Sequence, residues 1–246
     1  MGRLHDKIIR DYVQHYSRVN RTIDPRGAGA KWLDNMEATY GGLVSSLPTG
    51  SRVLDLGCGT GFLLRWLSMH PGIVPVGVDS CPTQVEVAEK SLPDVELVCQ
   101  DGTEFLRRHQ NSFVAIFCTD VLEHIPDQDS CLELVEAAKD SLLPGGFFCC
   151  RAPNAASLVG THSRYLDLTH YRSFTSPSII QLLAAAGLSD CRIVPIRSGH
   201  LTGKVRLLLE RIIHKTLFGI CGRPMEDHFT SNVCAVGYKK GTAENE

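Results

Sequence analysis

The sequence predicts an α/β fold built on a doubly wound, mostly parallel sheet. Between Ser51 and Arg151, apolar strand-like runs alternate with helix-like stretches, which is typical of a parallel sheet with helices on both faces. A glycine-rich turn follows the first run, and an acidic residue stands at or just after the end of each of the first four runs. With 246 residues, of which 43% are hydrophobic, the chain is long enough for one packed α/β domain.

The glycine-rich turn, Gly57-Cys58-Gly59-Thr60-Gly61, precedes a helix-like stretch that begins at Phe62. Glycines allow a tight turn and let a ligand approach the backbone, and the free N–H groups of the following helix face that ligand. The turn therefore predicts a nucleotide-type cofactor site. Its G-x-G-x-G spacing differs from the dinucleotide fingerprint G-x-G-x-x-G. Asp55, just before the turn, would also repel a pyrophosphate, so a nicotinamide cofactor is excluded.

The four acidic residues are expected at one edge of the sheet, where open α/β sheets bind their ligands. Asp55 can attract an ammonium group, directly or through water. Asp79 can accept hydrogen bonds from both hydroxyls of a ribose, and Asp101, which precedes Gly102, can hold an adenine amino group. Asp120 follows the fourth run. A ligand with an ammonium, a ribose diol and an adenine fits this arrangement, and S-adenosylmethionine has all three groups.

Between about Arg52 and Arg151 the chain resembles the class I S-adenosylmethionine-dependent methyltransferases. Five segments carry the resemblance: Leu54-Asp55-Leu56-Gly57-Cys58-Gly59-Thr60-Gly61, Gly77-Val78-Asp79, Asp101-Gly102, Asp120-Val121-Leu122-Glu123-His124-Ile125-Pro126-Asp127 and Leu142-Leu143-Pro144-Gly145-Gly146. The resemblance implies a Rossmann-like methyltransferase fold with a seven-stranded sheet and S-adenosyl-L-methionine as cofactor. In that family the glycines approach the methionine part of the cofactor. The residues after the fourth strand line the same end of the cofactor site. The implied cofactor-binding residues are Asp55, Gly57, Gly59, Gly61, Asp79, Ser80, Asp101, Gly102, Asp120, Val121 and Leu122.

Methyl transfer is an in-line displacement, so the protein must align the acceptor and, for a hydroxyl, remove its proton. The candidate catalytic residues are His124, Asp167 and His170, with His162 as a weaker fourth. His124 follows the fourth run, and in this fold the segments after the fourth and fifth strands commonly line the acceptor pocket. A neutral histidine near pH 7 suits a general base. A histidine can instead cap backbone groups: for His124 the two interpretations stay open, and for His162 we favour the structural one.

A divalent metal site is a second interpretation of the same region. Asp120-x-x-Glu123-His124, with His170 later in the chain, resembles the metal-assisted O-methyltransferases of the ubiquinone pathway and the small-RNA 2′-O-methyltransferases, which carry Glu at the position of Asp120. Carboxylates and imidazoles can hold an ion that binds and acidifies a hydroxyl. Glu-His at this place is also widespread in methyltransferases without metal, so we favour a general base.

Composition excludes several other classes of protein. The formal net charge is −2, so no global field draws the chain to nucleic acid or to anionic lipid. The ten cysteines include no Cys-x-x-Cys pair, which argues against a zinc ribbon or a thioredoxin-type site. No run approaches the length of a membrane span and no apolar signal core opens the chain. We expect a reducing, cytoplasmic setting, and a monomer or a homodimer.

Three parts are expected along the chain: an N-terminal helical cap (1–48), a methyltransferase domain (49–240) and a disordered tail (241–246). In the cap, helices are expected over Ile8–Val13 and Lys31–Leu47, joined by a flexible turn over Asp24–Gly29. The cap either covers the cofactor cleft as a lid or packs on the sheet edge. Near the C-terminus we expect a helix over Ser176–Ala186 with Ser176 as N-cap, and two antiparallel strands over 189–196 and 232–239.

An insertion of about 200–230 separates these last two strands. Apolar residues recur there at helical spacing, and basic residues surround them: Val205, Leu208, Leu209, Ile212 and Ile213 with Lys204, Arg206, Arg211, His214 and Lys215. A basic amphipathic helix over about 200–220 can lie on a membrane surface. We favour instead a helix that closes the active site or packs on the core.

The favoured function is O-methylation of a hydroxyl on a small molecule or a glycan. The segment from Asp167 to Thr175 and the helix after it resemble methyltransferases of bacterial surface-polysaccharide and natural-product clusters; N-methylation stays open. One alternative is a pseudo-enzyme that binds the cofactor and regulates a partner through the insertion. Another is an RNA 2′-O-methyltransferase, which the lack of a large basic excess disfavours.

Overall fold

The chain folds around one seven-stranded sheet whose strands run in the order β3-β2-β1-β4-β5-β7-β6. The computed structural model describes Ile8, Val13 and residues 24–241. The expected tail, apart from Gly241, and most of the expected helix over Ile8–Val13 lie outside these residues. The strands are β1 Ser51–Leu56, β2 Ile73–Asp79, β3 Glu96–Cys99, β4 Phe113–Thr119, β5 Leu142–Pro153, β6 Ser189–Ile193 and β7 Asn232–Tyr238.

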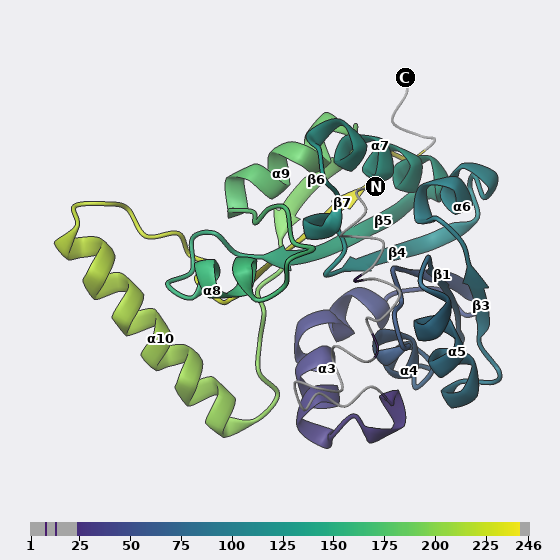
Figure 1. Cartoon of the computed structure of the whole chain (residues 1–246), viewed down its shortest axis with the longest axis horizontal. Coiled ribbons are helices and arrows are strands. Elements are labelled where there is room, and N and C mark those ends of the chain that lie inside the picture. The colour runs from purple at the N-terminus through teal and green to yellow at the C-terminus, as the bar shows by residue number, and fades with distance from the viewer. Residues whose placement is uncertain (1–7, 9–12, 14–23, 242–246) are drawn as a thin grey trace.

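Helices cover both faces of the sheet (Figure 1). On one face lie α3 Ala30–Val44, α4 Phe62–Leu67 and α5 Pro82–Ser91; on the other lie α6 Gly102–Arg108, α7 Gln128–Ser141 and α9 Ser176–Ala185. Shorter helices are η1 Pro25–Gly27, η2 Leu122–His124 and α8 Gly160–Tyr165. The stretch expected as a flexible turn therefore contains η1, which the Asp24 carboxylate caps by accepting the Arg26 N–H at 2.8 Å.

Strands β1 to β5 run parallel, whereas β7 pairs antiparallel with both β5 and β6. This arrangement confirms the predicted fold class and the antiparallel pair at the C-terminus. β1 pairs with β2 on one side and with β4 on the other. The chain therefore reverses its strand order at β1, and a crevice forms at the carboxyl ends of β1 and β4.

Two apolar cores, one on each face, hold the helices to the sheet. Successive strand residues point to opposite faces, so Val53 of β1 lies in one core and its neighbour Leu54 in the other. In the core shared with α3, the buried Tyr40 ring meets the Phe117 ring of β4 edge to face at 5.5 Å. The helix predicted over Lys31–Leu47 is thus α3, packed against the sheet.

The N-cap of α9 is Thr175, not Ser176 as the sequence suggested. The Thr175 backbone is extended, with φ −99° and ψ 168°. Its side chain accepts the Ser178 N–H, and the Ser178 hydroxyl accepts the Thr175 N–H at 2.9 Å. This reciprocal capping box fixes the helix start one residue earlier, because Ser176 already lies in the first turn beside Pro177.

Helix α10, Leu201–Ile220, fills most of the insertion before β7 and stands apart from the sheet (Figure 1). Of its residues only Gly203 and His214 are buried, and none lines the cavity described below. The favoured expectation that it closes the active site or packs on the core was therefore wrong. No helix among the described residues is long and apolar enough to cross a membrane.

The capping box predicts a stability difference between two neighbouring substitutions. We expect Thr175→Ala to lower the free energy of unfolding by about 1 kcal/mol, because it removes the acceptor for a helix N–H. Ser176→Ala is the matched control, since the Ser176 hydroxyl has no hydrogen-bond partner in the described part of the chain; it should change stability by less than about 0.5 kcal/mol. Urea unfolding of both variants measures this, and a larger loss for Ser176→Ala would contradict the assignment.

Candidate active site

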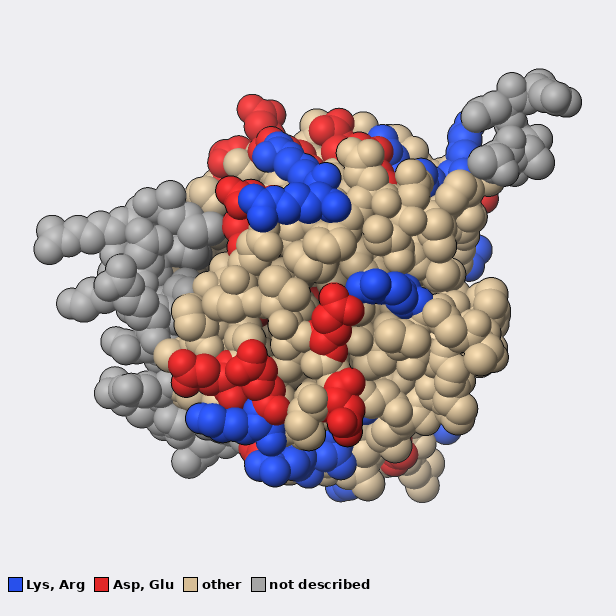
Figure 2. All heavy atoms as spheres, turned by 90° about the vertical axis from the view of Figure 1, so that its right-hand side faces the viewer, with Lys and Arg blue, Asp and Glu red and all other residues tan. Residues whose placement is uncertain are grey.

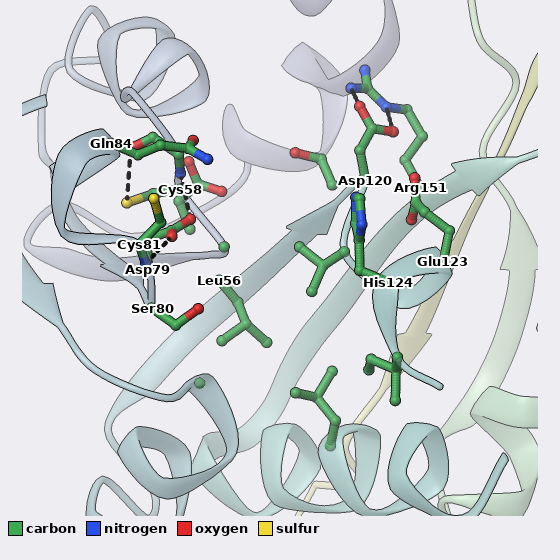
Figure 3. Close-up of a pocket in the computed structure, with 18 of the residues that line it drawn as sticks. Leu56, Cys58, Asp79, Ser80, Cys81, Gln84, Asp120, Glu123, His124 and Arg151 are labelled. Atoms are coloured by element: carbon green, nitrogen blue, oxygen red, sulfur yellow. Dashed lines mark hydrogen bonds and ion pairs between the residues drawn. The ribbon is translucent and has the colours of Figure 1, made fainter. Parts of the chain in front are cut away.

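The carboxyl ends of β1, β2 and β4 surround a cavity of about 1490 Å³. Figure 3 shows its two facing walls, which carry Asp79, Ser80, Cys81 and Gln84 on the β2 side and Asp120, Glu123, His124 and Arg151 on the β4 and β5 side. All predicted site residues line this cavity except Gly61 and Leu122. Gly61 precedes α4 as its N-cap, and Leu122 is fully buried in the core.

The N-terminal part of the chain also contributes to the cavity wall. Trp32 and Met36 of α3 lie there together with Val13. Met36 belongs at the same time to the core under the sheet. Helix α3 thus packs on the sheet and borders the site, and a lid role for the N-terminal cap stays a prediction.

The glycine turn forms a close-packed part of the cavity floor. Gly57 and Gly59 have φ angles of +74° and +54°, in the left-handed region that favours glycine. A Cβ on Gly57 would lie 2.3 Å from Cγ2 of Val121, and one on Gly59 would lie 2.6 Å from Oε1 of Gln84. The Val121 and Gln84 side chains thus lie where a Cβ would stand, so glycine is needed at both positions for this close packing.

Asp79 ties the end of β2 to this turn. One carboxylate oxygen accepts the Gly59 N–H at 2.8 Å, and the other accepts the Cys81 N–H at 2.8 Å. Burial raises the pKa of Asp79, and these two backbone hydrogen bonds oppose the rise. Because each carboxylate oxygen has two lone pairs, both oxygens can still accept a hydrogen bond from a bound hydroxyl.

Asp55 is a buried carboxyl group with an unused oxygen. It is 1% exposed, and its Oδ1 has no hydrogen-bond partner in the part of the chain that the structure describes. Burial, and then the charge of Asp79, raise the pKa of Asp55 to about 8, against the opposing effect of Arg151. A cation that entered the cavity beside this group would compensate its buried charge, so an ammonium group fits here.

Asp101 and Gly102 lie at the start of α6, on the cavity wall. The Asp101 carboxylate caps the helix by accepting the Glu104 N–H at 3.0 Å. A Cβ on Gly102 would lie 2.7 Å from Cδ1 of Leu56, so the helix start sits close to the end of β1. Capping occupies one acceptor position of Asp101 and leaves others for a ligand amino group.

Asp120 is paired with a residue that sequence reasoning missed. Arg151 of β5 donates from Nε to Asp120 Oδ1 at 3.0 Å and from Nη2 to Oδ2. Although burial works in the opposite direction, the Asp120 carboxylate raises the pKa of Arg151. Asp120 has φ +58°, a conformation that Asp adopts more readily than most residues. The only signal for this pair is the strand register, in which Thr119 lies beside Arg151.

A chain of hydrogen bonds orients His124. The buried Thr169 hydroxyl lies 2.7 Å from Asp167 Oδ1 and 2.8 Å from His124 Nδ1. Because Thr169 donates its single hydroxyl proton to Asp167, its oxygen can only accept from the ring, and His124 must donate from Nδ1. In the neutral ring the lone pair is then on Nε2. Thr169 was not singled out from the sequence, because its role depends on a partner 45 residues away.

His170 lies beside His124, with ring centroids 4.7 Å apart. The Tyr171 N–H donates to the Glu123 carbonyl at 2.7 Å, which brings this loop against η2. His170 Nδ1 lies 3.0 Å from the Ser163 carbonyl oxygen. A carbonyl only accepts, so the neutral ring of His170 also has its lone pair on Nε2. The exposed His162 is at the cavity wall as well.

Glu123, His124 and His170 form a possible ligand set for a metal ion, with ligand atoms within 4.8 Å of one another. Burial, followed by the charge of Asp120, raises the pKa of Glu123 well above its usual value. Its Oε2 has no hydrogen-bond partner among the described residues. Asp120 is not part of this group, and its carboxylate is paired with Arg151.

Comparison with known proteins identifies the family and the fold. The model of a methyltransferase-domain family matches residues 29–192, and the chain belongs to that family. A solved structure of a SAM-dependent methyltransferase from Archaeoglobus fulgidus superposes with a TM-score of 0.68 at 18% identity, covering 93% of this chain and 99% of that one. The cyclase SpnF superposes with a TM-score of 0.59 at 18% identity over 97% of this chain and 96% of that one. Likeness at these identities shows the fold alone.

Relatives of known name match part of the chain. A ubiquinone biosynthesis O-methyltransferase of Xanthomonas campestris pv. campestris is 31% identical over 143 residues, which are 52% of this chain and 58% of that protein. One of the same name from Coxiella burnetii is 36% identical over 101 residues, or 39% of this chain and 41% of that protein. The chain thus spans about half the length of the curated relatives it matches.

The raised pKa of Asp55 predicts a pH-dependent stability. The folded-state pKa of about 8 lies above the ordinary value of 3.8, so between these pH values the folded chain holds a proton that the unfolded chain has lost. The free energy of unfolding then falls as pH rises, by up to about 1.4 kcal/mol per pH unit from this group. Asp55→Asn removes the effect. We expect its free energy of unfolding, relative to the unmodified chain, to grow from about pH 5 to about pH 8.

Urea unfolding at several pH values measures this difference. Asp94→Asn is the control, because Asp94 lies exposed in the turn before β3 and should show no such trend. A difference between Asp55→Asn and the unmodified chain that stays constant over the range would contradict a raised pKa at Asp55.

Proposed function

We propose that the chain is an S-adenosylmethionine-dependent methyltransferase that transfers a methyl group to a hydroxyl of a small molecule. The observation that carries this proposal is the cavity at the carboxyl ends of β1 and β2. There the buried Asp55 carboxyl, whose Oδ1 has no partner among the described residues, and Asp79, which can accept hydrogen bonds from a ribose, flank the glycine turn. Family membership supports it. The fold alone does not, since the cyclase SpnF shares it.

The cofactor would be held by the residues predicted from the sequence. Asp55 would take the ammonium group, and Asp79 the ribose hydroxyls. The backbone of Gly57 and Gly59 would lie against the methionine part, with Asp101 and Gly102 near the adenine. The bound cofactor supplies a methyl group on a sulfonium, which needs no activation by the protein. The chain's own task is therefore to orient the acceptor and to take up its proton.

His124 is the proposed general base. The Asp167–Thr169–His124 chain places the lone pair on Nε2, and His124 lies at the cavity wall on the side opposite Asp79 (Figure 3). Nε2 would accept the hydroxyl proton as the oxygen attacks. The positive ring that results keeps its Nδ1–H on Thr169, whose hydroxyl is held by the buried Asp167, so no side chain has to move during proton transfer.

The names of the relatives support a hydroxyl acceptor. These relatives are named ubiquinone biosynthesis O-methyltransferases. Their name fits O-methylation and gives no support to a sugar as the acceptor. The glycan acceptor therefore stays a prediction from a short resemblance. An RNA acceptor is disfavoured, since the formal net charge is −2, whereas nucleic-acid binding is favoured by a basic excess. On the face shown in Figure 2, acidic and basic side chains are mixed.

Cofactor binding is tested by calorimetric titration with S-adenosylhomocysteine. We expect micromolar binding that Asp79→Ala weakens at least about tenfold, because the substitution removes two acceptors for the ribose and frees the glycine turn. Asp94→Ala is the control and should bind as the unmodified chain does. NAD should not bind. Binding of NAD, or binding of S-adenosylhomocysteine that Asp79→Ala leaves unchanged, would contradict the proposed site.

The general base is tested with hydroxylated acceptors, beginning with catechols and phenols, and the transferred methyl is measured directly. We expect His124→Gln to lower kcat about 10² to 10⁴-fold with little change in cofactor affinity. Thr169→Val should lower kcat about tenfold or more, because the Nδ1–H of His124 then loses the acceptor that fixes its tautomer. Thr169→Ser keeps a hydroxyl and should preserve kcat. Thr216→Val on α10 is the control.

Equal loss in Thr169→Ser and Thr169→Val would contradict the orienting role of the hydroxyl. A chain that binds cofactor yet methylates no acceptor would support the alternative of a regulatory pseudo-enzyme.

Metal assistance is a second candidate mechanism, favoured by one observation: Glu123, His124 and His170 converge, and a buried Glu123 oxygen lacks a partner. One carboxylate and two imidazoles suit a divalent transition ion. The same assays with and without EDTA separate the two mechanisms. Activity that EDTA abolishes and added Mn²⁺ restores would favour the metal, whereas insensitivity to EDTA favours the unassisted base.

A further inference from the structure

Helix α10 presents its apolar side to solvent. We name as the outward face its large apolar residues that are between 46% and 80% exposed: Leu201, Val205, Leu208, Leu209, Ile212, Ile213, Leu217 and Ile220. In a globular protein an amphipathic helix normally turns such a stripe toward the core. In α10 the apolar stripe points to solvent instead, and the outward face spans the full length of this 20-residue helix.

The opposite side of α10 is fixed to the rest of the chain, so the orientation of the outward face is set by specific contacts. The buried His214 accepts the Leu158 N–H at Nε2, at a distance of 2.9 Å, and its ring lies 5.3 Å from the Phe229 ring. Near the helix start, Gly203 is buried so closely against Ser198 that a Cβ there would lie 2.0 Å from the Ser198 hydroxyl. These residues recur on one side of the helix, opposite the outward face.

Basic residues flank the outward face. Lys204, Arg211 and Lys215 follow one edge and Arg206 lies at the other, and all four are exposed. The single acid of the helix, Glu210, pairs with Arg206 at 3.5 Å. The helix is thus basic in a chain whose formal net charge is −2. This charge is complementary to an anionic surface, whereas two copies of α10 meeting face to face would bring like charges together.

Apolar exposure continues next to α10. Leu158, whose backbone N–H donates to His214, is 42% exposed, and its neighbour Val159 is 53% exposed. An apolar area of this extent on one region of a chain marks an interaction site.

We propose that α10 is an interfacial helix that docks the chain on a bilayer containing anionic phospholipid. The outward face would enter the boundary between headgroups and acyl chains, and the flanking lysines and arginines would contact lipid phosphates. The helix lies along the surface and does not cross it, in agreement with the charges it carries. Docking requires no methyl transfer, so the experiment measures binding alone.

The test is co-sedimentation of the full chain with vesicles of phosphatidylcholine and phosphatidylglycerol in equal parts, and with vesicles of phosphatidylcholine alone. We expect binding to the mixed vesicles, and binding at least about tenfold weaker to the neutral ones, because several cations each add attraction to an anionic surface. Added salt should weaken binding to the mixed vesicles.

Two double variants separate the apolar and the charge contributions. Leu208→Gln with Ile212→Gln should weaken partitioning at least about a hundredfold, because two large apolar side chains lose their burial in lipid. Lys204→Glu with Lys215→Glu should weaken it about twenty-fold or more on mixed vesicles. The matched control combines Met69→Gln, on another exposed apolar residue, with Lys90→Glu, on an exposed lysine of α5. All these positions are exposed, so thermal unfolding should be unchanged.

Three results would overturn the proposal. The first is a chain that sediments with neither kind of vesicle. The second is binding that the α10 variants weaken no more than the control does. The third is a dimer, seen by sedimentation velocity, that the Leu208→Gln/Ile212→Gln variant dissociates in a chain that binds no vesicle; a second copy would then cover the outward face.

Discussion

The buried carboxyl group of Asp55 is the constraint on which the site depends. It stands at the end of β1, between β2 and β4, where the sheet and the glycine turn exclude water from it and it is 1% exposed. Nearby Asp79 adds a like charge that raises the Asp55 pKa further. A carboxyl group in this position is stable as a neutral acid or beside a cation. The centre of the cleft therefore favours a positively charged ligand group.

The rest of the cleft is arranged around that position. Asp79 holds the glycine turn in place by accepting the Gly59 N–H. On the facing wall, Arg151 balances Asp120 and opposes the rise in the Asp55 pKa. His124 is oriented by Thr169, which lies behind the cavity wall, and Thr169 is held in turn by Asp167. One wall thus suits a nucleoside with an ammonium group, and the other suits proton transfer. A methyl transfer to a hydroxyl needs both.

Local patterns in the sequence predicted most of the fold, and they predicted which residues gather at the carboxyl ends of β1 and β2. Strand runs, the glycine turn and the acids at strand ends are signals within a few residues of one another, and the alternation of strands with helices predicts a parallel sheet. What escaped prediction depends on distant partners. The Asp120–Arg151 pair exists because β4 and β5 share a register, and Thr169 reaches His124 through a loop contact. The cap of α9 moved by one residue because Thr175 and Ser176 both suit the position. For α10, periodicity showed which residues share a face, but not that this face points outward.

A crystal structure of the chain with S-adenosylhomocysteine tests the central claim most directly. The account predicts the amino group of the ligand within hydrogen-bond reach of Asp55, directly or through one water, and both ribose hydroxyls on Asp79. The adenine should lie beside Asp101 and the sulfur should face His124. A ligand bound elsewhere, or bound in reverse with its adenine at Asp55, would contradict the account.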